Sequence, residues 1–445
     1  MTTAEKDRSV AERGMGFGLR ALNRLAGSDL LDRIRIRKQV ERALFQGTKN
    51  GFRTATAAGR TFKAAQQLGK PARQARSKSK GLFDVTPDDE QQMFQEAGRA
   101  FAEEKIRPAA LEADAERQTP KEVLDQAVEL GVNMLGVPEE LGGVMHEQSA
   151  VTSVLIGEAL AHGDLGIAYA ALAPGAVATA IGLWGSAEQE AAYLPAFTGE
   201  DVPPAALAIL EPRPLFDPRK PETKARRDGD DWVLSGAKSL LARASECELF
   251  VVGAEAEGIG AVLFVVESGA KGLEVEDEPA MGLRPAATGR LLIDEVRVPA
   301  TALLGEGKTE DYAECIDRSR IAWSALATGT AQAVLDYVIP YVNDRQAFGE
   351  PISNRQGVAF AVSDIGIETG GMRLSTYRAA SRADRGEPFA REAAIARRLS
   401  AAKGMKIGSD GVQLLGGHGF VKEHPVERWY RDLRAAGVME GALLV

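Results

Sequence analysis

The chain has 445 residues, of which 44% are hydrophobic and 26% charged, and its formal net charge at pH 7 is −9. These values are typical of a soluble protein of two to four domains. Two distant cysteines, Cys247 and Cys315, and four histidines without metal-ligand spacing exclude a disulfide framework and make a metal site unexpected. No signal peptide and no apolar run of eighteen residues stand out, so we predict a cytoplasmic protein without a membrane span.

The charge is unevenly distributed along the chain. Residues 1–80 contain 19 Lys and Arg against 6 Asp and Glu, a balance of +13, which leaves 35 basic and 57 acidic residues, a balance of −22, for the remainder. A basic arm is therefore joined to an acidic body, and the two parts are expected to have separate roles.

Residues 1–85 form the predicted basic N-terminal extension. Leucines and isoleucines recur at helical spacing between Arg and Lys, as at Leu19, Leu22 and Leu25. Basic amphipathic helices suit an anionic membrane surface, so we predict a peripheral contact with the inner face of the membrane. Packing of the arm on a partner subunit is the alternative that stays open. No aromatic interleaving supports nucleic-acid binding, and we expect none.

The body begins with a predicted helical domain over residues 86–202. Thr86 is the expected N-cap and Pro87 the first-turn proline of the first helix. Amphipathic helical stretches continue through KIRPAALEADAER and PKEVLDQAVELGV, and the punctuated loop PEELGGV precedes further helices. Residues 203–302 change to β-branched runs such as WVLSGA and AVLFVVES, which predict a small central β-domain.

Residues 303–445 return to a helical pattern and carry the candidate chemistry. Arg345 begins the segment RQAFGEPI, and a guanidinium suits phosphate binding, although an ordinary helix-end arginine is the alternative. Gly416 and Gly417 allow the backbone to approach a flat or phosphorylated ligand, and Gln413 lies one helical turn earlier. Glu440 is a lone carboxylate in an apolar run. Desolvation is expected to raise its pKa and make it a general base, unless it is a surface residue near a frayed end.

The pattern Q-x-x-G-G-x-G-F-x-x-E-x-P-x-E-R-x-Y-R-D, followed after seven residues by E-G, closely resembles the C-terminal segment of the acyl-CoA dehydrogenases. The helical stretches before residue 202 and the β-domain resemble the same family. The resemblance implies a mostly α fold with a central β-domain, between an N-terminal helical domain and a C-terminal helical bundle. It also implies an oligomer, a dimer or a tetramer of like or unlike chains, that binds FAD.

The resemblance assigns roles to particular residues. Glu440 corresponds to the family's catalytic base, and Ser319, at the alternative position for that base, cannot replace it. Contacts to the FAD of a neighbouring subunit fall to Arg345, Phe348, Gln356, Gln413, Gly416 and Gly417. Contacts to the acyl-CoA substrate fall to Asp317, Arg320 and Gly441.

The chain departs from the family pattern in two places. In the β-domain, Leu210 and Phe216 replace a threonine and a serine near the flavin, and Leu240-Leu241-Ala242 replaces a W-I-T or W-I-S segment that stacks on the flavin ring. At the end, the family usually reads E-G-T and continues for another helix, whereas the sequence reads Glu440-Gly441-Ala442 and ends at Val445.

The predicted function is therefore FAD-dependent α,β-dehydrogenation of an acyl-CoA thioester, in fatty-acid β-oxidation or related lipid metabolism. An electron-transfer flavoprotein is the expected acceptor. The lost β-domain contacts keep a second reading open, a non-catalytic or half-site subunit of a hetero-oligomeric acyl-CoA dehydrogenase. A membrane-associated binding protein on an enzyme scaffold is a third.

Overall fold

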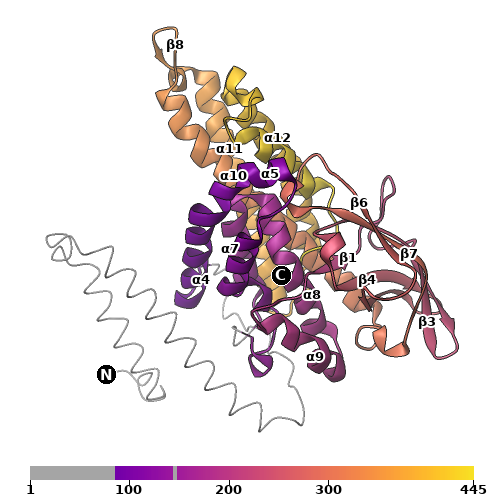
Figure 1. Cartoon of the computed structure of the whole chain (residues 1–445). Helices are drawn as coiled ribbons and strands as arrows, with labels where there is room; N and C mark the ends of the chain where they lie inside the picture. Colours follow the sequence, from indigo (N-terminus) through magenta and orange to yellow (C-terminus); the bar gives the residue numbers. More distant parts are fainter. Residues whose placement is uncertain (1–85, 144–147) are drawn as a thin grey trace, which may run out of the picture. The chain divides into compact units, whose positions relative to one another are not determined.

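A computed structural model describes residues 86–143 and 148–445 (Figure 1). All of them belong to one of the two units into which the chain divides, Lys70–Val445. The basic arm, 1–85, lies outside the described residues, so the membrane contact stays a prediction.

Helices make up the first part of the body. The α-helices are α4 (Asp89–Phe101), α5 (Arg107–Glu116), α6 (Lys121–Leu130), α7 (Ala150–Gly163), α8 (Leu165–Trp184) and α9 (Ala187–Tyr193), with a π-helical turn at Ala102–Ile106 and 3-10 turns at Val132–Met134, Glu139–Leu141 and Leu194–Thr198. The predicted N-cap Thr86 is wrong. The side chain of Asp88 accepts from the Gln91 N–H (2.8 Å) and the Asp88 N–H donates to the Gln91 side chain (3.1 Å). This reciprocal capping box starts α4 at Asp89.

Helices α7 and α8 form the centre of the helical core. Asp164 separates them and caps α8, because its side chain accepts from the Ile167 N–H (3.0 Å). The expectation that no long apolar run exists is wrong, since α8 has 20 residues and a mean hydropathy of 1.6 over its most apolar window. By length and composition it could cross a membrane, but 89% of that window is buried inside the fold, as in a core helix of a soluble protein.

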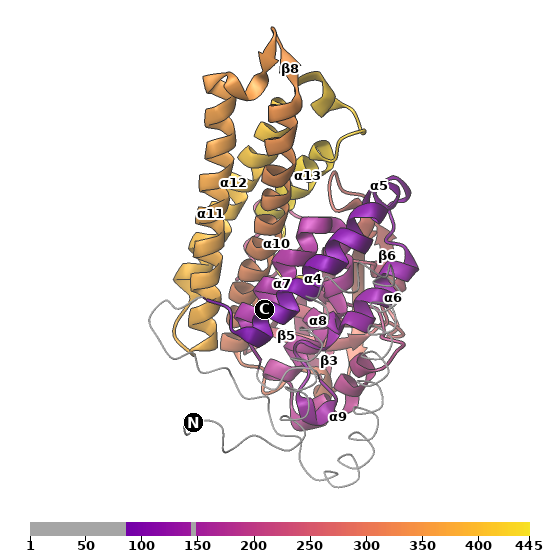
Figure 2. The same cartoon turned by 90° about the vertical axis from the view of Figure 1, so that its left-hand side faces the viewer.

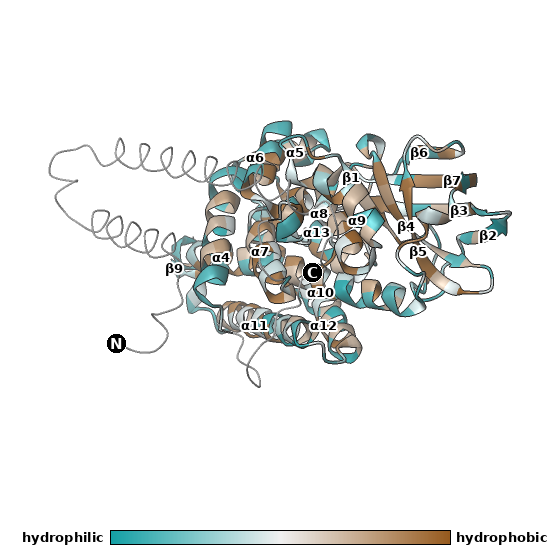
Figure 3. Cartoon of the chain, turned by 90° about the horizontal axis from the view of Figure 1, so that it is seen from below, coloured by the Kyte–Doolittle hydropathy of each residue, from teal (hydrophilic) through white to brown (hydrophobic). Residues whose placement is uncertain are grey.

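The middle of the chain folds into one seven-stranded sheet. Its strands are β1 (Ala205–Ala208), β2 (Lys224–Asp228), β3 (Asp231–Leu241), β4 (Leu249–Ala256), β5 (Gly260–Glu267), β6 (Leu273–Asp277) and β7 (Gly289–Val298), with 3-10 turns at Ala244–Glu246, Arg284–Ala286 and Ala300–Ala302. The order is β1-β4-β2-β3-β7-β6, with β5 antiparallel to β4. Figure 3 shows β4 and β7 largely apolar and β2 hydrophilic. This agrees with the burial of β4 and the exposure of β2.

The last part is a helical bundle, followed by a segment that runs back into the body. It consists of α10 (Thr309–Asp344), the hairpin β8 (Gln346–Ala347) and β9 (Glu350–Pro351), α11 (Gln356–Asp384), α12 (Ala390–Leu414) and α13 (Val426–Leu433), with 3-10 turns at Ile352–Asn354, Gly416–Phe420 and Arg434–Gly437. Helices α10, α11 and α12 lie side by side, with β8 at one end of the bundle (Figure 2). The predicted fold class, helical domains on either side of a central β-domain, is confirmed.

Helix α10 connects the two regions where the predicted site residues gather. It has 36 residues and is therefore about 54 Å long. It packs on α7 and also contacts α11 and α12. Beyond α13, the residues after Gly437 turn back toward α10, where Met439, Leu443 and Val445 join the same apolar core as α7 and α8.

Candidate active site

Glu440 lies between α10 and α12 and is held by two arginines. Its Oε2 accepts from Arg320 Nε (3.2 Å) and its Oε1 accepts from Arg397 Nη2 (3.0 Å). The carboxylate is only 11% exposed. A buried charge needs such partners, because desolvation without compensation is costly. The expectation of a carboxylate among apolar residues only is therefore corrected: two guanidiniums share its site.

Arg397 is a site residue that the sequence analysis missed. It lies in α12, sixteen positions before Gln413, and its side chain also donates to the Ala436 carbonyl. Burial lowers the pKa of Arg397, while the negative charge of Glu440 acts in the opposite direction. The run Ala-Arg-Arg-Leu gave no signal by itself, since basic residues on a helix are ordinarily solvated.

Gly441 is fixed in place by α10. Its carbonyl accepts from Ser319 Oγ (2.5 Å) and from Trp323 Nε1 (2.8 Å). Its φ is +74°, and a Cβ at this position would lie 2.4 Å from the Ile209 Cβ. Glycine is therefore required both by conformation and by space. Ser319, which could not be a base, anchors the backbone beside Glu440.

Asp317 and Arg320 lie on α10 beside Glu440, as the resemblance implies for substrate-binding residues. Arg219 Nη2 donates to Asp317 Oδ1 (2.6 Å), and Arg320 Nη1 is 3.9 Å from the same oxygen. Burial raises the pKa of Asp317, and the charge of Arg219 opposes that rise. The structure thus gathers Asp317, Arg320, Glu440 and Gly441 at one place, where the Arg320 guanidinium lies between the carboxylates of Asp317 and Glu440.

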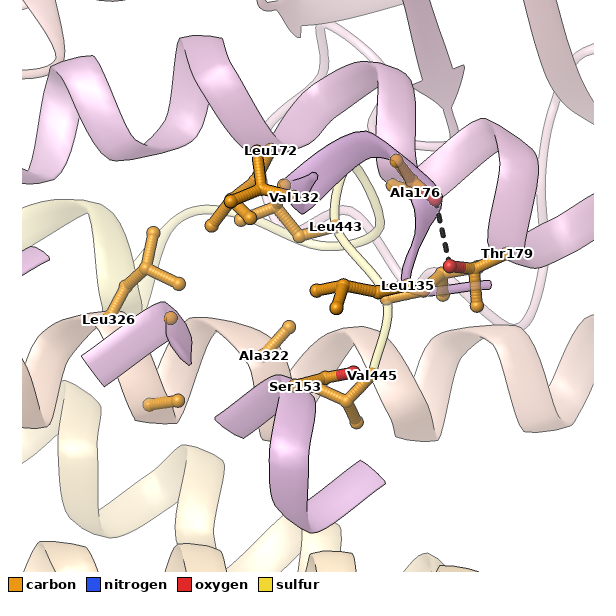
Figure 4. A pocket seen from close by; sticks show the side chains of 14 residues that line it. Val132, Leu135, Ser153, Leu172, Ala176, Thr179, Ala322, Leu326, Leu443 and Val445 are labelled. Carbon is orange, nitrogen blue, oxygen red and sulfur yellow. Dashed lines mark hydrogen bonds between the residues drawn. The ribbon is translucent and has the colours of Figure 1, made fainter. Parts of the chain in front are cut away.

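An apolar chamber adjoins this cluster. It lies between α7, α8 and α10, with the turn Val132–Met134 closing one side. Figure 4 shows Leu443 and Val445 among the side chains that line it, together with Leu135, Leu172 and Ala322. The space left free is about 20 Å³, which is about enough for one water molecule. The segment that carries Glu440 therefore forms part of the wall of a nearly closed apolar space.

A second site, an open groove, lies at the other end of α10. Its volume is about 610 Å³, and its lining includes Arg345, Phe348, Gln413, Gly416 and Gly417. Nothing lies within 4 Å of a Cβ built on either glycine, so the backbone is open to a ligand there. Among the residues that the structure describes, the exposed Arg345 side chain has no ion-pair partner. It is thus available to an anion.

Gln356 lies beside this groove and does not line it. It is the exposed first residue of α11, and its neighbours Arg355 and Gly357 form part of the wall. The predicted FAD residues are therefore together, with Gln356 at the margin.

Phe348 occupies the tip of the hairpin β8–β9. Its φ of +56° is unusual for a bulky side chain, and Gly349 follows with a φ of +87°. The ring is 95% exposed, with the Arg355 guanidinium 5.5 Å from its centroid. A strained aromatic residue held in solvent at a hairpin tip suggests a partner surface as the reason for its conformation.

The two centres are far apart within one chain. Twenty-five helical residues separate Arg320 from the position of Arg345, which corresponds to about 38 Å along α10. A group bound in the groove of one chain therefore lies well away from Glu440 of the same chain.

The β-domain positions that depart from the family pattern are closed by apolar packing. Leu210 and Ala242 are buried in the large helical core, and Phe216 packs against it beneath the Arg213 guanidinium, 5.3 Å from the ring centroid. Tyr169 OH donates to the Leu240 carbonyl (2.9 Å) and accepts from the Ala242 N–H (3.1 Å). The Leu240 carbonyl and the Ala242 N–H are thus satisfied within the chain, and the side chains that replace the family's flavin contacts pack against its own core.

Comparison with known proteins gives consistent matches along the body. Three family models match: "Acyl-CoA dehydrogenase, N-terminal domain" at residues 88–201, "middle domain" at 206–296 and "C-terminal domain" at 310–443. The bovine mitochondrial short-chain specific acyl-CoA dehydrogenase is 34% identical over 366 residues, covering 79% of this chain and 86% of its own. The acryloyl-CoA reductase (NADH) of Anaerotignum propionicum is 32% identical, covering 81% and 93%.

Solved structures resemble the same part of the chain. Butyryl-CoA dehydrogenase from Megasphaera elsdenii has a TM-score of 0.72 at 28% identity and covers 82% of this chain and 96% of its own. A chain from the structure described as an electron transferring flavoprotein of Acidaminococcus fermentans has a TM-score of 0.74 at 28% identity, covering 81% and 96%.

Proposed function

Because the chain belongs to the acyl-CoA dehydrogenase family, flavin-dependent oxidoreductases that act on CH–CH groups, we propose that it works in the α,β-dehydrogenation of an acyl-CoA thioester, with Glu440 as the base. Fatty-acid oxidation or related lipid metabolism is the expected setting. The observation that carries this proposal is the position of Glu440, a nearly buried carboxylate on the segment that enters an apolar chamber.

The proposed chemistry explains why this carboxylate is buried and held. The α C–H of a thioester is too weak an acid for a carboxylate in water, so the base has to be positioned beside it in a site that excludes water. Arg320 and Arg397 balance the charge of Glu440 and fix its direction. The hydrogen bonds that Ser319 and Trp323 donate to the Gly441 carbonyl hold the backbone of the same segment.

The family's cofactor, FAD, supplies the hydride acceptor when it is bound. Within residues 86–143 and 148–445, the groove at the end of α10 fits part of it. The groove with Arg345, Gln413 and the two glycines suits a phosphate-bearing cofactor, whereas Leu210 and Ala242, at positions that contact the ring in the family, are buried in the chain's own core. We therefore propose an oligomer in which the groove of one subunit serves a cofactor held mainly by another. The electron-transfer flavoprotein remains the expected acceptor.

The role of Glu440 can be measured without the cofactor. Glu440→Gln should slow the exchange of the α-proton of an acyl-CoA in D₂O, followed by NMR, by about 10²- to 10⁴-fold, the usual contribution of a general base. Glu423→Gln, a change at an exposed carboxylate, is the matched control. Exchange at the wild-type rate in the Glu440→Gln protein would show that the base lies elsewhere.

A half-site subunit is the second candidate, and the closed β-domain positions favour it. In that case the chain completes a partner's flavin site through the groove and lacks a flavin of its own. The chain should be purified alone and with paralogous subunits, with mass measured by light scattering and flavin per chain by absorbance. If the chain is a half-site subunit, flavin should be found only in the mixed oligomer. A monomer that binds one FAD per chain would exclude it.

A further inference from the structure

Two of the chain's four histidines lie together at the groove end of α10. His418 is exposed and lines the groove, whereas His424 is half-buried behind it, with the two ring centroids 5.7 Å apart in an edge-to-face arrangement. Tyr341 of α10 also lines the groove and contacts both rings. Its hydroxyl is 3.3 Å from His418 Nδ1, and its ring centroid is 5.6 Å from that of His424. The proposed function gives neither histidine a role.

The hydrogen bonds of Tyr341 determine which nitrogen of His418 carries a hydrogen. The Tyr341 hydroxyl donates its single hydrogen to the Leu415 carbonyl (3.2 Å). The hydroxyl oxygen is then left to accept from His418, so Nδ1 of that ring is the donor. Nε2 has no hydrogen-bond partner within the described part of the chain and is the nitrogen left for a ligand. In the neutral ring Nε2 presents a lone pair, and in the protonated ring it presents an N–H.

The two sides of the groove differ in charge. The side formed by the end of α10 and the start of α11 carries Arg345 and Arg355. The side at the C-terminal end of α12 carries Asp410, which is paired with Lys406. A helix C-terminus bears partial negative charge, so this second side disfavours an anion. His418 lies on that side, and in its protonated form it supplies a positive charge there.

We propose that His418 contacts a phosphate of a diphosphate-bearing ligand through Nε2, and that the ring takes up a proton when this ligand binds. The class of ligand rests on the proposed function, in which the groove serves a phosphate-bearing cofactor. The lone pair of a neutral Nε2 would be directed at phosphate oxygens, which only accept hydrogen bonds. Histidine is the side chain whose charge ordinarily changes between about pH 5 and 8. The proton comes from the solvent and returns to it when the ligand leaves.

His424 is the alternative carrier of that proton. Its Nδ1 is 2.6 Å from the Tyr337 hydroxyl, and its ring is outside the lining of the groove. The titratable groups that contact His418 or share its groove are Tyr341, Arg345, Arg355, Asp410 and His424. Of these only His424 is a second imidazole, so the experiment has to separate the two histidines.

Calorimetric titration of the purified chain with ADP measures the proton. The binding enthalpy at pH 7 is compared in buffers of different ionisation enthalpy, such as Tris and PIPES, which gives the protons taken up per ADP. Since ADP exchanges protons itself, the difference between proteins is the quantity to be read. The wild-type chain should take up more protons than His418→Gln, and His418→Gln should bind ADP about tenfold more weakly, through loss of a hydrogen bond to a charged group. Inorganic pyrophosphate should show the same difference, because the proton belongs to the phosphate contact.

Two further variants make the assignment specific. His418→Arg places a permanent positive charge at the same position, so it should bind ADP at least as tightly as His418→Gln does and show no more proton uptake than that variant. His424→Gln is the matched control, the same substitution at the histidine outside the groove lining, and should keep the wild-type uptake. Circular dichroism checks that each variant is folded.

Three results would overturn the proposal. The first is equal proton uptake in the wild-type chain and His418→Gln, and the second is uptake that is lost in His424→Gln instead. The third is a wild-type chain that binds neither ADP nor pyrophosphate. None of these titrations involves Glu440 or an acyl-CoA. A failure here is therefore distinct from a failure of Glu440 as base, which the α-proton exchange experiment addresses.

Discussion

Asp432 is a buried carboxyl whose surroundings raise its pKa. It is fully buried, and its Oδ1 accepts from the Leu283 N–H (2.7 Å), but its Oδ2 has no hydrogen-bond partner within the described residues. The nearby Arg428 donates to Asp164 Oδ2 (2.9 Å), not to Asp432. Burial and the charge of Asp164 raise the pKa of Asp432 to about 8. The folded protein therefore favours the protonated form of this carboxyl.

The raised pKa predicts a particular pH dependence of stability. In the unfolded chain Asp432 loses its proton near the ordinary aspartate value of 3.8, and in the folded chain near 8, so the folded state binds more protons between these values. The stabilisation is complete below about pH 4 and is lost as pH rises toward 8. Asp432→Asn keeps an acceptor for the Leu283 N–H and should remove that loss, giving about 1–3 kcal/mol of extra stability at pH 8. Thermal unfolding of both proteins from pH 5 to 8 measures this difference. If the stabilities of the two proteins change with pH in parallel, Asp432 does not have a raised pKa.

At the scale of elements, the hairpin β8–β9 combines strain with exposure. Phe348 is held at a φ of +56° at the tip, with its ring in solvent, while Arg345 at the base of the hairpin lines the groove. An element that costs the isolated chain stability and buries nothing is expected to act on another molecule. In the proposed oligomer that molecule is the neighbouring subunit and its cofactor.

Phe348→Asn separates the cost of the strained backbone from the proposed contact of the ring with a neighbouring subunit. Asparagine tolerates a left-handed backbone, so the isolated chain should gain about 1 kcal/mol of stability. The oligomer should lose subunit affinity or flavin occupancy, measured by light scattering and absorbance. Leu374→Asn, at an exposed leucine of α11, is the control for lost surface hydrophobicity. A more stable chain with unchanged oligomer and flavin content would show that the hairpin has no such role.

At the scale of the whole molecule, charge divides the chain into parts with different partners. The arm carries +13 over residues 1–80, and the remainder carries −22. A basic amphipathic segment gains about 1 kcal/mol per Lys or Arg near an anionic lipid surface, which the acidic body cannot provide. We therefore expect the arm to direct an otherwise independent catalytic body to a membrane surface.

Deletion of residues 1–85 tests this division. The fragment 86–445 should remain folded and soluble but no longer co-sediment with anionic vesicles. The full chain should bind them and be released by salt, because the attraction is screened within about 10 Å at 0.1 M ionic strength. Vesicle binding that is unchanged in the fragment would disprove the role of the arm.

The sequence by itself determined the family and the helical and β-domain pattern, and it predicted two groups of site residues, because these depend on local periodicity and fixed motif spacing. The tertiary structure alone decided what surrounds them. Arg397 contacts Glu440 from α12, most of the apolar helix α8 is buried inside the fold, and Leu443 and Val445 line the chamber between α7, α8 and α10. It also separated the two groups, with about 38 Å along α10 between Arg320 and Arg345. Each of these depends on contacts between residues far apart in the chain. No local sequence pattern shows which distant side chain will pair with a buried charge or line a pocket.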